Sequence, residues 1–230
     1  MEAEENFVLI AGLICEPARA RMLWNLLDGR AYTATELSAA ADISSSSASN
    51  HLAKLLSADI VKFEMQGRHR YYSFSNPEIA YAVEALANLA GSSRSSGQPK
   101  KEITGAGVKY CRTCYDHLAG FVAVKIVAAL EQNGCLNKTD KAYLVTAKGW
   151  KWFAGFGILS DDFTNNRRPL TRQCLDWSER RPHLAGQLGS VFLEKMLHRK
   201  WFKKIQFSRE LELMPKGRRE LNELLGITLR

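Results

Sequence analysis

Apolar and polar positions alternate with helical spacing in "ISSSSASNHLAKLLSADIV", residues 43–61, a stretch that opens with a run of four serines. The apolar positions that recur every three or four residues are Ala48, Leu52, Leu55 and Leu56. The polar positions between them are Ser45, Ser46, Ser49, Asn50 and Lys54. This pattern predicts an amphipathic surface helix whose first turn presents small hydrogen-bonding side chains.

The neighbouring segments predict further short elements. Helical periodicity covers "ENFVLIAGLICE" and "ARARMLWNLLDG", with Pro17 suited to the start of the second helix and Gly29 to its end. Thr33 or Thr35 can cap a short helix in "YTATELSAAADI". The run "IVKFEMQGRHRYYSF" predicts a β-hairpin with glycine in its turn, and Asn76 caps a last helix, "NPEIAYAVEALANLA".

The order of these elements is that of a winged helix-turn-helix. A helix that enters the DNA major groove needs small hydrogen-bonding side chains near its N-terminus, where they reach base edges and phosphates without steric clash. The amides of the first turn also favour a phosphate. Serines cap many ordinary surface helices, but the hairpin that follows, with "QGRHR" at its tip, favours the DNA-binding interpretation.

These segments resemble the ArsR/SmtB family of dimeric bacterial repressors over about residues 8–90. The resemblance rests on the pattern S-x-S-x-x-S-x-H-L in the serine-rich helix and G-R-x-x-Y-Y in the hairpin. It implies a homodimer that reads a palindromic double-stranded operator, a dimer contact between the first and last helices, and an effector that weakens DNA affinity. The residues expected at the DNA are Ser45, Ser46, Ser49, Asn50, His51 and Lys54 in the helix and Arg68 and Arg70 in the wing.

Two familiar metal sites of that family are missing from the sequence. Metal sensors in the family carry Cys-x-Cys on the helix before the recognition helix, but "TELSAAADI" has neither cysteine nor histidine. Others use Asp/His pairs on the last helix, and "NPEIAYAVEALANLA" has no histidine. Any signal is therefore expected to be sensed outside residues 1–90.

Charge and composition divide the chain in two. Residues 1–91 hold 7 Lys and Arg against 11 Asp and Glu, a net charge of −4, whereas residues 92–230 hold 25 against 13, a net charge of +12. The segment "GSSRSSGQPKK", residues 91–101, is rich in glycine and serine and has no apolar residue, which is typical of a linker. We therefore expect one domain at 1–90 and a second at 102–230.

The overall composition, with 46% hydrophobic and 24% charged residues, is that of a soluble globular protein. No apolar run reaches the length of about 18 residues needed for a membrane span, and the acidic N-terminus is unlike a secretory signal. The cysteines lack the spacing of a small disulfide scaffold. These features predict a cytoplasmic protein, with no membrane partner, whose thiols are reduced or bind metal.

The second half contains two similar segments, about residues 111–158 and 174–227. Each has Cys-x-Asp, His-Leu-Ala-Gly, a helix, a short hairpin, Lys-Gly and a final helix ending in Gly-Ile. We interpret this as a diverged internal repeat. The fold class that follows is mainly α with small β-hairpins in the winged helix-turn-helix, followed by an α+β domain of two helix–hairpin–helix repeats.

The repeat places Cys114 with His117, and Cys174 with His183, at matching positions. If the repeats pack about a pseudo-twofold axis, two thiolates and two imidazoles could converge, which suits zinc or another soft divalent ion. Cys111 extends the first pair to "CRTCYDH", whose members are expected on one side of a helix. Ordinary burial in the core is the competing interpretation of these residues.

Two other kinds of signal stay open at this point. A thiol redox switch could use Cys111, Cys114 or Cys174 if one of them is exposed in an electropositive setting. An organic ligand could bind among aromatic side chains. The aromatic residues available for such a pocket are Trp150, Trp152, Phe153, Phe156, Trp177, Trp201 and Phe202.

A DNA-binding transcriptional regulator is the function that these patterns predict. The expected form is a homodimeric repressor released from its operator by an effector (metal, oxidant or small organic ligand) acting through residues 102–230. We do not expect an enzyme, since "TGAGVK" lacks the third glycine of a nucleotide fingerprint and no P-loop, G-x-S-x-G or H-E-x-x-H occurs. The alternative is a winged-helix module that binds another protein, which the acidic balance of residues 1–91 favours.

Overall fold

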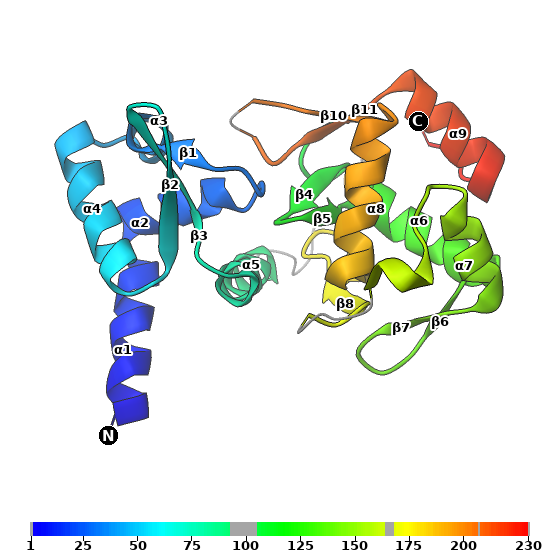
Figure 1. The fold of residues 1–230 in the computed structure, drawn as a ribbon, viewed down its shortest axis with the longest axis horizontal. Helices are drawn as coiled ribbons and strands as arrows, with labels where there is room; N and C mark the ends of the chain where they lie inside the picture. The colour runs from blue at the N-terminus through cyan, green and yellow to red at the C-terminus, as the bar shows by residue number, and fades with distance from the viewer. Residues whose placement is uncertain (1, 93–104, 164–167, 207, 230) are drawn as a thin grey trace. The chain divides into compact units, whose positions relative to one another are not determined.

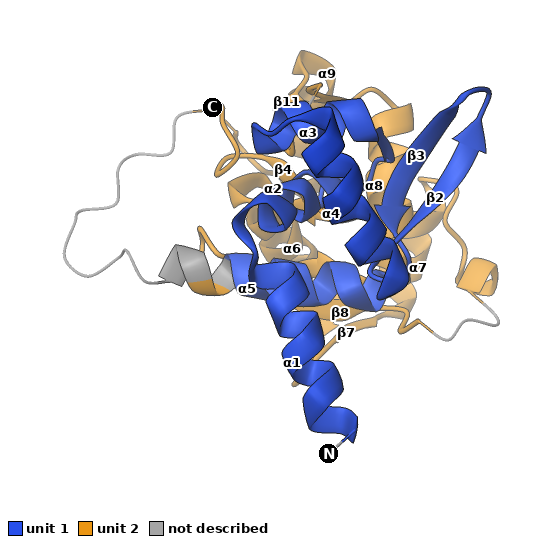
Figure 2. Cartoon of the chain, turned by 90° about the vertical axis from the view of Figure 1, so that its left-hand side faces the viewer, with its two compact units in different colours: residues 1–87 blue, residues 88–230 orange. Residues whose placement is uncertain are grey.

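The chain forms two compact units, Met1–Ala87 (unit 1) and Asn88–Arg230 (unit 2), which are coloured separately in Figure 2. The computed structural model describes residues 2–92, 105–163, 168–206 and 208–229. The predicted linker, residues 91–101, begins within the last turn of a helix, and from residue 93 it lies outside the described residues. Among the described residues, no helix has both the length and the apolar character to span a bilayer.

Unit 1 has the predicted winged helix-turn-helix order (Figure 1). Its elements are α1 (Glu2–Cys15), α2 (Pro17–Leu26), β1 (Tyr32–Thr33), α3 (Ala34–Ala41), α4 (Ser45–Ser57), β2 (Val61–Gln66), β3 (His69–Phe74) and α5 (Pro77–Ser92), the last of which runs past the unit boundary. The three strands form one antiparallel sheet in the order β1-β3-β2. The wing is therefore a hairpin that β1 extends on one edge.

Side-chain caps set the helix starts of unit 1. Thr33 is the N-cap of α3, and it forms a capping box with Glu36 in which each side chain accepts a hydrogen bond from the other residue's backbone amide. Asn76 accepts a hydrogen bond from the Ile79 amide at 3.1 Å and caps α5. Ser44 caps α4. The predicted caps at Asn76 and at the first of the two candidate threonines are thus confirmed.

The recognition helix and the wing are built as their residue patterns predict. In α4 the apolar positions Ala48, Leu52 and Leu55 are buried, so the polar face points outward. In the wing, Gln66 pairs with His69 and leaves a two-residue turn. The turn's Gly67 has φ +61°, a left-handed backbone conformation that glycine adopts without a steric penalty.

Unit 2 runs hairpin, helix, hairpin, helix, and then repeats that order. The first segment consists of β4 (Arg112–Cys114), β5 (His117–Ala119), α6 (Phe121–Gln132), β6 (Leu136–Lys138), β7 (Tyr143–Val145) and α7 (Ala147–Ala154). After the 3₁₀ turn Ser160–Phe163, the second consists of β8 (Arg172–Leu175), β9 (Pro182–Ala185), α8 (Gly186–His198), β10 (Phe202–Lys204), β11 (Leu211–Leu213) and α9 (Pro215–Leu225). The predicted helix–hairpin–helix units therefore omitted a hairpin at the start of each segment.

The helical interpretation of "CRTCYDH" is wrong, because the chain turns back inside it. Tyr115 has φ +57°, and the two-residue turn that contains it joins β4 to β5. The first helix of the segment starts only after Gly120, at φ +88°. A Cβ on Gly120 would lie 2.9 Å from the Lys109 carbonyl oxygen, and one on Gly186, at φ +87°, would lie 2.8 Å from the Leu170 carbonyl oxygen. Each His-Leu-Ala-Gly glycine thus serves the same close hairpin-to-helix junction.

The two segments of unit 2 contact each other reciprocally. The Thr113 amide in β4 donates to the Arg209 carbonyl in the β10–β11 connection at 2.8 Å. The Gln173 amide in β8 donates to the Lys141 carbonyl in the β6–β7 connection at 2.9 Å. In each case the second hairpin of one segment reaches the first hairpin of the other, and strands β5 and β9 lie in contact. That arrangement holds the two leading hairpins together.

Several of the predicted aromatic side chains fill the core of unit 2. Phe153, Phe156 and Trp201 are buried, and Phe192 packs edge-to-face on Trp152, Phe153 and Phe156. The cavity between α6 and α8 measures about 20 Å³, enough for about one water molecule. An organic effector does not fit within this part of the aromatic core.

Candidate functional sites

The candidate DNA-binding face is the start of α4 together with the wing. The side chains predicted from the sequence that are exposed are Ser45, Ser46, Ser49, Asn50, Lys54, Arg68 and Arg70. Ser44 accepts a hydrogen bond from the Ser47 amide at 3.2 Å, and the first turn of the helix carries no acidic residue. The exposed first turn therefore combines serine hydroxyls with the positive end of the helix dipole.

His51 is the exception among the predicted DNA-contacting residues. Its Nδ1 lies 3.3 Å from the Arg19 guanidinium and 3.4 Å from the Glu16 carboxylate, both at the start of α2. The ring is half-buried and packs against α2. We therefore leave His51 out of the proposed DNA-binding face, which keeps the other seven residues.

Helix α1 presents an apolar surface to solvent. Phe7 is 72% exposed, Leu9 57%, and Ile14 is the one buried residue among those described in this helix. Leu86 on α5 is also exposed. A helix that buries so little of its apolar surface gains little from packing in a monomer.

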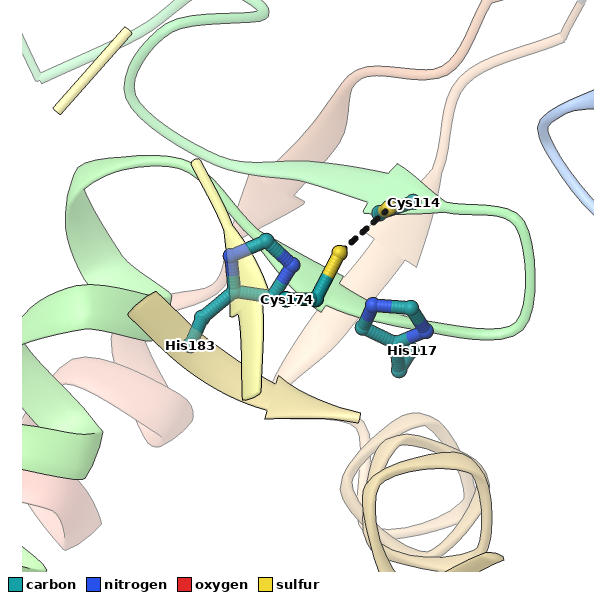
Figure 3. Close-up of side chains that lie close together, drawn as sticks. All are labelled: Cys114, His117, Cys174 and His183. Carbon is teal, nitrogen blue, oxygen red and sulfur yellow. Dashed lines mark hydrogen bonds between the residues drawn. The ribbon is translucent and has the colours of Figure 1, made fainter. Parts of the chain in front are cut away.

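Four of the five predicted metal-ligating residues come together in unit 2 (Figure 3). Cys114, His117, Cys174 and His183, here called the Cys/His cluster, have ligand atoms that all lie within 4.8 Å of one another. The two sulfur atoms are 3.8 Å apart and the two imidazole centroids 5.1 Å. None of the four residues is more than 8% exposed. Figure 3 shows one ring nitrogen of each histidine pointing toward the Cys174 sulfur.

Hairpin register brings each cysteine beside its histidine. Cys114 and His117 are directly paired across β4 and β5, and Cys174 and His183 are directly paired across β8 and β9. Directly opposed residues of an antiparallel pair project from the same face of the sheet. Each hairpin therefore contributes one thiol and one imidazole, even though its loop has two residues in the first case and eight in the second.

Cys111, the fifth predicted ligand, is not part of this cluster. It precedes β4, which begins at Arg112, and it packs with a different group of buried residues from Cys114 and Cys174. Its side chain packs in the hydrophobic core with Tyr110 and Leu118. Burial there raises the pKa of the Cys111 thiol well above its ordinary range.

A carboxylate stands behind the first histidine. His117 Nδ1 donates to Asp116 at 3.2 Å, and both terminal nitrogens of Arg168 donate to the same carboxylate, at 2.5 and 3.1 Å. Burial raises the pKa of Asp116, but the contacts with His117 and Arg168 outweigh it and bring that pKa to about 2. Asp116 is therefore ionised and orients the ring of His117.

The second histidine has an equivalent neighbour. Asp176 lies 3.7 Å from His183 Nδ1 and accepts hydrogen bonds from Arg112 at 2.8 Å and from the Gly120 amide at 2.7 Å. The Arg112 guanidinium in turn lies over the Trp177 ring at 4.5 Å. Burial raises the pKa of Asp176, but Arg112, His183 and the hydrogen bonds from Ser178 and the Gly120 amide together outweigh it and lower that pKa.

The sequence interpretation noted Cys-x-Asp in both segments but gave the aspartates and arginines no role. A longer signal, Arg-x-Cys-x-Asp, was available. It occurs as Arg112, Cys114 and Asp116 in the first segment and as Arg172, Cys174 and Asp176 in the second. Because the two segments exchange contacts, Asp176 pairs with the arginine of the first segment instead of its own.

The cluster is polarised even without a bound ion. A hydrogen bond from the neighbouring Cys114 thiol holds the pKa of Cys174 well below its ordinary range. Burial opposes this lowering of the pKa, and the imidazoles of His183 and His117 add to it. Burial lowers the pKa of His117, but Asp116 and the sulfur of Cys174 outweigh that effect and raise it to about 9. Cys174 therefore has thiolate character, which is the form of cysteine that binds metals.

Comparison with known proteins identifies the family of this chain. A family model described as a helix-turn-helix domain matches residues 15–62, which contain α2, α3 and α4. An uncharacterized HTH-type transcriptional regulator of Bacillus subtilis (strain 168), YdfF, is 36% identical over 228 residues, covering 97% of this chain and 99% of the relative. The chain belongs to the HTH-type transcriptional regulators. The match with YdfF extends through unit 2, so this regulator and its relative share the extension as well as the DNA-binding unit.

Solved structures of other proteins match about two fifths of the regulator's length. Reduced HlyU from Vibrio cholerae N16961 is 26% identical, covers 38% of this chain and 92% of its own, and has a TM-score of 0.36. The homodimeric winged helix-turn-helix domain of Mb0332 from Mycobacterium bovis, a possible ArsR-family regulator, is 18% identical over 39% of this chain and 82% of its own, with a TM-score of 0.36. The family assignment rests on the full-length relative, and the ArsR/SmtB resemblance of the recognition helix and wing agrees with it.

Proposed function

We propose that this regulator is a homodimeric repressor that binds an operator through α4 and the wing. The observation that carries the proposal is the exposed first turn of α4, where Ser45, Ser46 and Ser49 stand beside Asn50. Ser49 donates its hydroxyl proton to the Ser45 carbonyl at 2.9 Å, which leaves its oxygen as an acceptor for a base or water. The amide of Asn50 can bind adenine in the major groove through two hydrogen bonds.

The charges of unit 1 favour sequence-specific DNA binding over non-specific electrostatic binding. Residues 1–91 carry a net charge of −4, so the general attraction of these residues to DNA phosphates is weak. Lys54 on α4 and Arg68 and Arg70 in the wing are exposed on the proposed face, and each can neutralise a phosphate. Arg70 also lies over the Phe63 ring at 4.8 Å, which holds its guanidinium along the wing.

The exposed apolar surface of α1 supports a homodimer. Phe7, Val8, Leu9 and Ile10 are all exposed in the monomer, and the same helix in a second copy is the partner that symmetry offers. A dimer would place two α4 helices on DNA about one helical turn apart, as in other helix-turn-helix dimers. The operator is then expected to be palindromic.

Selection of duplexes from a random-sequence pool by the intact chain tests this function. We expect enrichment of a palindromic sequence whose half-sites are about 10 base pairs apart, or a multiple of that. A pool that shows no enrichment after repeated rounds would contradict operator binding. It would favour the alternative function, a winged-helix module that binds another protein.

We further propose that the effector acts through unit 2. A chain without residues 93–230 keeps α1 to α5 and should bind the selected duplex with an affinity close to that of the full chain. Any ion, oxidant or small molecule that releases the full chain from the duplex should leave the shortened chain bound. The measurement is fluorescence anisotropy of the labelled duplex, and equal release of both chains would contradict a role of unit 2 in the response.

A further inference from the structure

We propose that the Cys/His cluster binds one soft divalent metal ion of the zinc class, with Cys114, His117, Cys174 and His183 as its four ligands. This inference goes beyond the proposed function, and it stands on the geometry of unit 2 alone. The ion joins the leading hairpins of the two segments, which are far apart in the sequence. Cys111 takes no part.

The separations suit a tetrahedral ion. Two thiolates bound to zinc at about 2.3 Å in tetrahedral geometry lie about 3.8 Å apart, and the Cys114 and Cys174 sulfur atoms are 3.8 Å apart. The remaining ligand atoms lie within 4.8 Å of one another, so closure around an ion takes side-chain movements of about 1 Å or less. Backbone rearrangement is not required.

The buried nitrogen atoms lack the partners that buried polar groups normally have. Among the described residues, Nε2 of His117 and both ring nitrogens of His183 have no hydrogen bond of acceptable geometry. The two rings are 0% and 1% exposed, so no bulk water reaches them. Unsatisfied polar atoms at this depth are rare in native proteins and call for an explanation. A metal ion bound through Nε2 of each ring supplies one for two of these three nitrogen atoms.

Charge balance also fits a divalent cation. Two thiolates and two neutral imidazoles carry a charge of −2, which a divalent ion cancels, so the loaded site is neutral in its buried setting. The two aspartates behind the histidines are already balanced by Arg168 and Arg112. Neither aspartate is therefore needed as a ligand.

The aspartates fix which nitrogen faces the ion. Asp116 and Asp176 lie beside Nδ1 of His117 and His183, at 3.2 and 3.7 Å. At His117 the hydrogen bond with Asp116 holds the proton on Nδ1 and leaves the lone pair of Nε2 for the metal, an arrangement that recurs around protein-bound zinc. At His183 the 3.7 Å separation is too long for a hydrogen bond, but the negative charge of Asp176 still favours a proton on Nδ1. Asp176 is fully buried and Asp116 partly so, and a carboxylate beside each histidine is hard to explain by packing of an apolar core.

The ligand set selects the class of ion and the kind of site. Thiolate and imidazole ligands favour zinc and similar soft ions over magnesium or calcium. Four protein ligands fill a tetrahedral shell and leave no open position for substrate, which is typical of structural sites and unlike catalytic ones. The site therefore holds unit 2 together and does not perform chemistry on a substrate.

A disulfide between Cys114 and Cys174 is the competing chemistry, and it leaves different evidence. The sulfur atoms are 3.8 Å apart, compared with about 2.05 Å in a disulfide bond. Oxidation would also leave the ring nitrogens of the two histidines without a metal ion to bind. Metal analysis and thiol counting on one sample separate the two possibilities.

The test uses the full chain, purified under reducing conditions without chelator. Elemental analysis should give about one zinc per chain, and denaturation with a chelator should expose five thiols, the number of cysteines. Protein refolded with Co²⁺ in place of zinc should show the visible ligand-field absorption of a tetrahedral site and thiolate-to-cobalt charge transfer. Metal-free protein that takes up neither zinc nor Co²⁺ overturns the proposal, as does a count of three thiols without metal.

Matched variants identify the ligands. Cys174→Ala and His183→Ala should each weaken Co²⁺ binding about 10-fold or more and change its spectrum. Cys111→Ala and Cys135→Ala remove buried cysteines outside the cluster, and His198→Ala removes a histidine near the end of α8, so all three should bind Co²⁺ as the parent does. Loss of binding in the Cys111 variant, with retention in the Cys174 variant, would overturn the assignment.

Discussion

Replacing Ser49 and Asn50 together by alanine should cost the regulator most of its affinity for the selected duplex. Each base contact of this kind contributes about 1–3 kcal/mol of discrimination, and a homodimer loses the contacts in both half-sites. We expect a decrease of about 30-fold to about 10⁴-fold, since two half-sites lose about 2–6 kcal/mol together and 1.4 kcal/mol corresponds to a factor of about ten. Affinity for a shuffled duplex should change little, because phosphate contacts from Lys54, Arg68 and Arg70 remain.

The control for this double variant is Ser57→Ala, which changes an exposed serine at the far end of the same helix. It should bind the selected duplex as the parent does. Both side chains in the double variant are exposed, and alanine has a higher helix propensity than serine or asparagine. The unfolding temperature should therefore not fall. Parental affinity of a folded Ser49→Ala/Asn50→Ala variant would contradict the recognition role of α4.

Removing the metal should produce the largest change in the stability of unit 2. An ion that binds only the folded state adds its binding free energy to folding, which amounts to about 10–16 kcal/mol in zinc-finger peptides. Unit 2 has its own apolar core, so we expect a smaller contribution of several kcal/mol. At about 2–4 °C per kcal/mol for a domain of this size, protein refolded in chelator should have a Tm at least about 10 °C lower than protein refolded with zinc.

Scanning calorimetry of the full chain measures this effect, because the transitions of the two units can differ. The difference between zinc and chelator should vanish in Cys174→Ala and persist in Cys135→Ala, whose substituted cysteine is also buried. A wild-type chain with the same unfolding temperature in zinc and in chelator would contradict a stabilising metal site in unit 2.

The sequence predicted unit 1 in detail because local signals dominate there. Helical periodicity, the caps at Thr33 and Asn76 and the glycine turn of the wing each act over a few residues, and each is present in the structure. His51 was harder to place. Its spacing puts it next to the polar face, but the pair with Arg19 and Glu16 depends on how α2 packs against α4.

In unit 2 the sequence located the ligand residues but not the elements that carry them. The internal repeat paired Cys114 with Cys174, and these residues do converge. The leading hairpins were missed because strands of three or four residues are too short to show a two-residue period. That omission also produced the error at Cys111, since a helix would place it near Cys114, whereas in the structure it precedes β4 and packs in the hydrophobic core.

The reciprocal pairing of the aspartates and arginines was beyond sequence reasoning for a different reason. Arg112 pairs with Asp176 across 64 positions, and Arg168 pairs with Asp116 across 52. Such contacts follow from the packing of the hairpins of one segment against those of the other, which no local pattern specifies. Finding Arg-x-Cys-x-Asp twice would have indicated a shared role for Arg112 and Asp176, but Arg168, the partner of Asp116, lies outside that motif.

The affinity of the intact chain for the selected duplex, relative to a shuffled duplex of the same composition, tests the central claim most directly. Measured at a fixed physiological salt concentration, the selected duplex should bind about 10³-fold more tightly or better, with two chains per duplex. Equal affinity for the two duplexes would contradict a sequence-specific repressor. The exposed face of α4 would then have to be assigned to another partner.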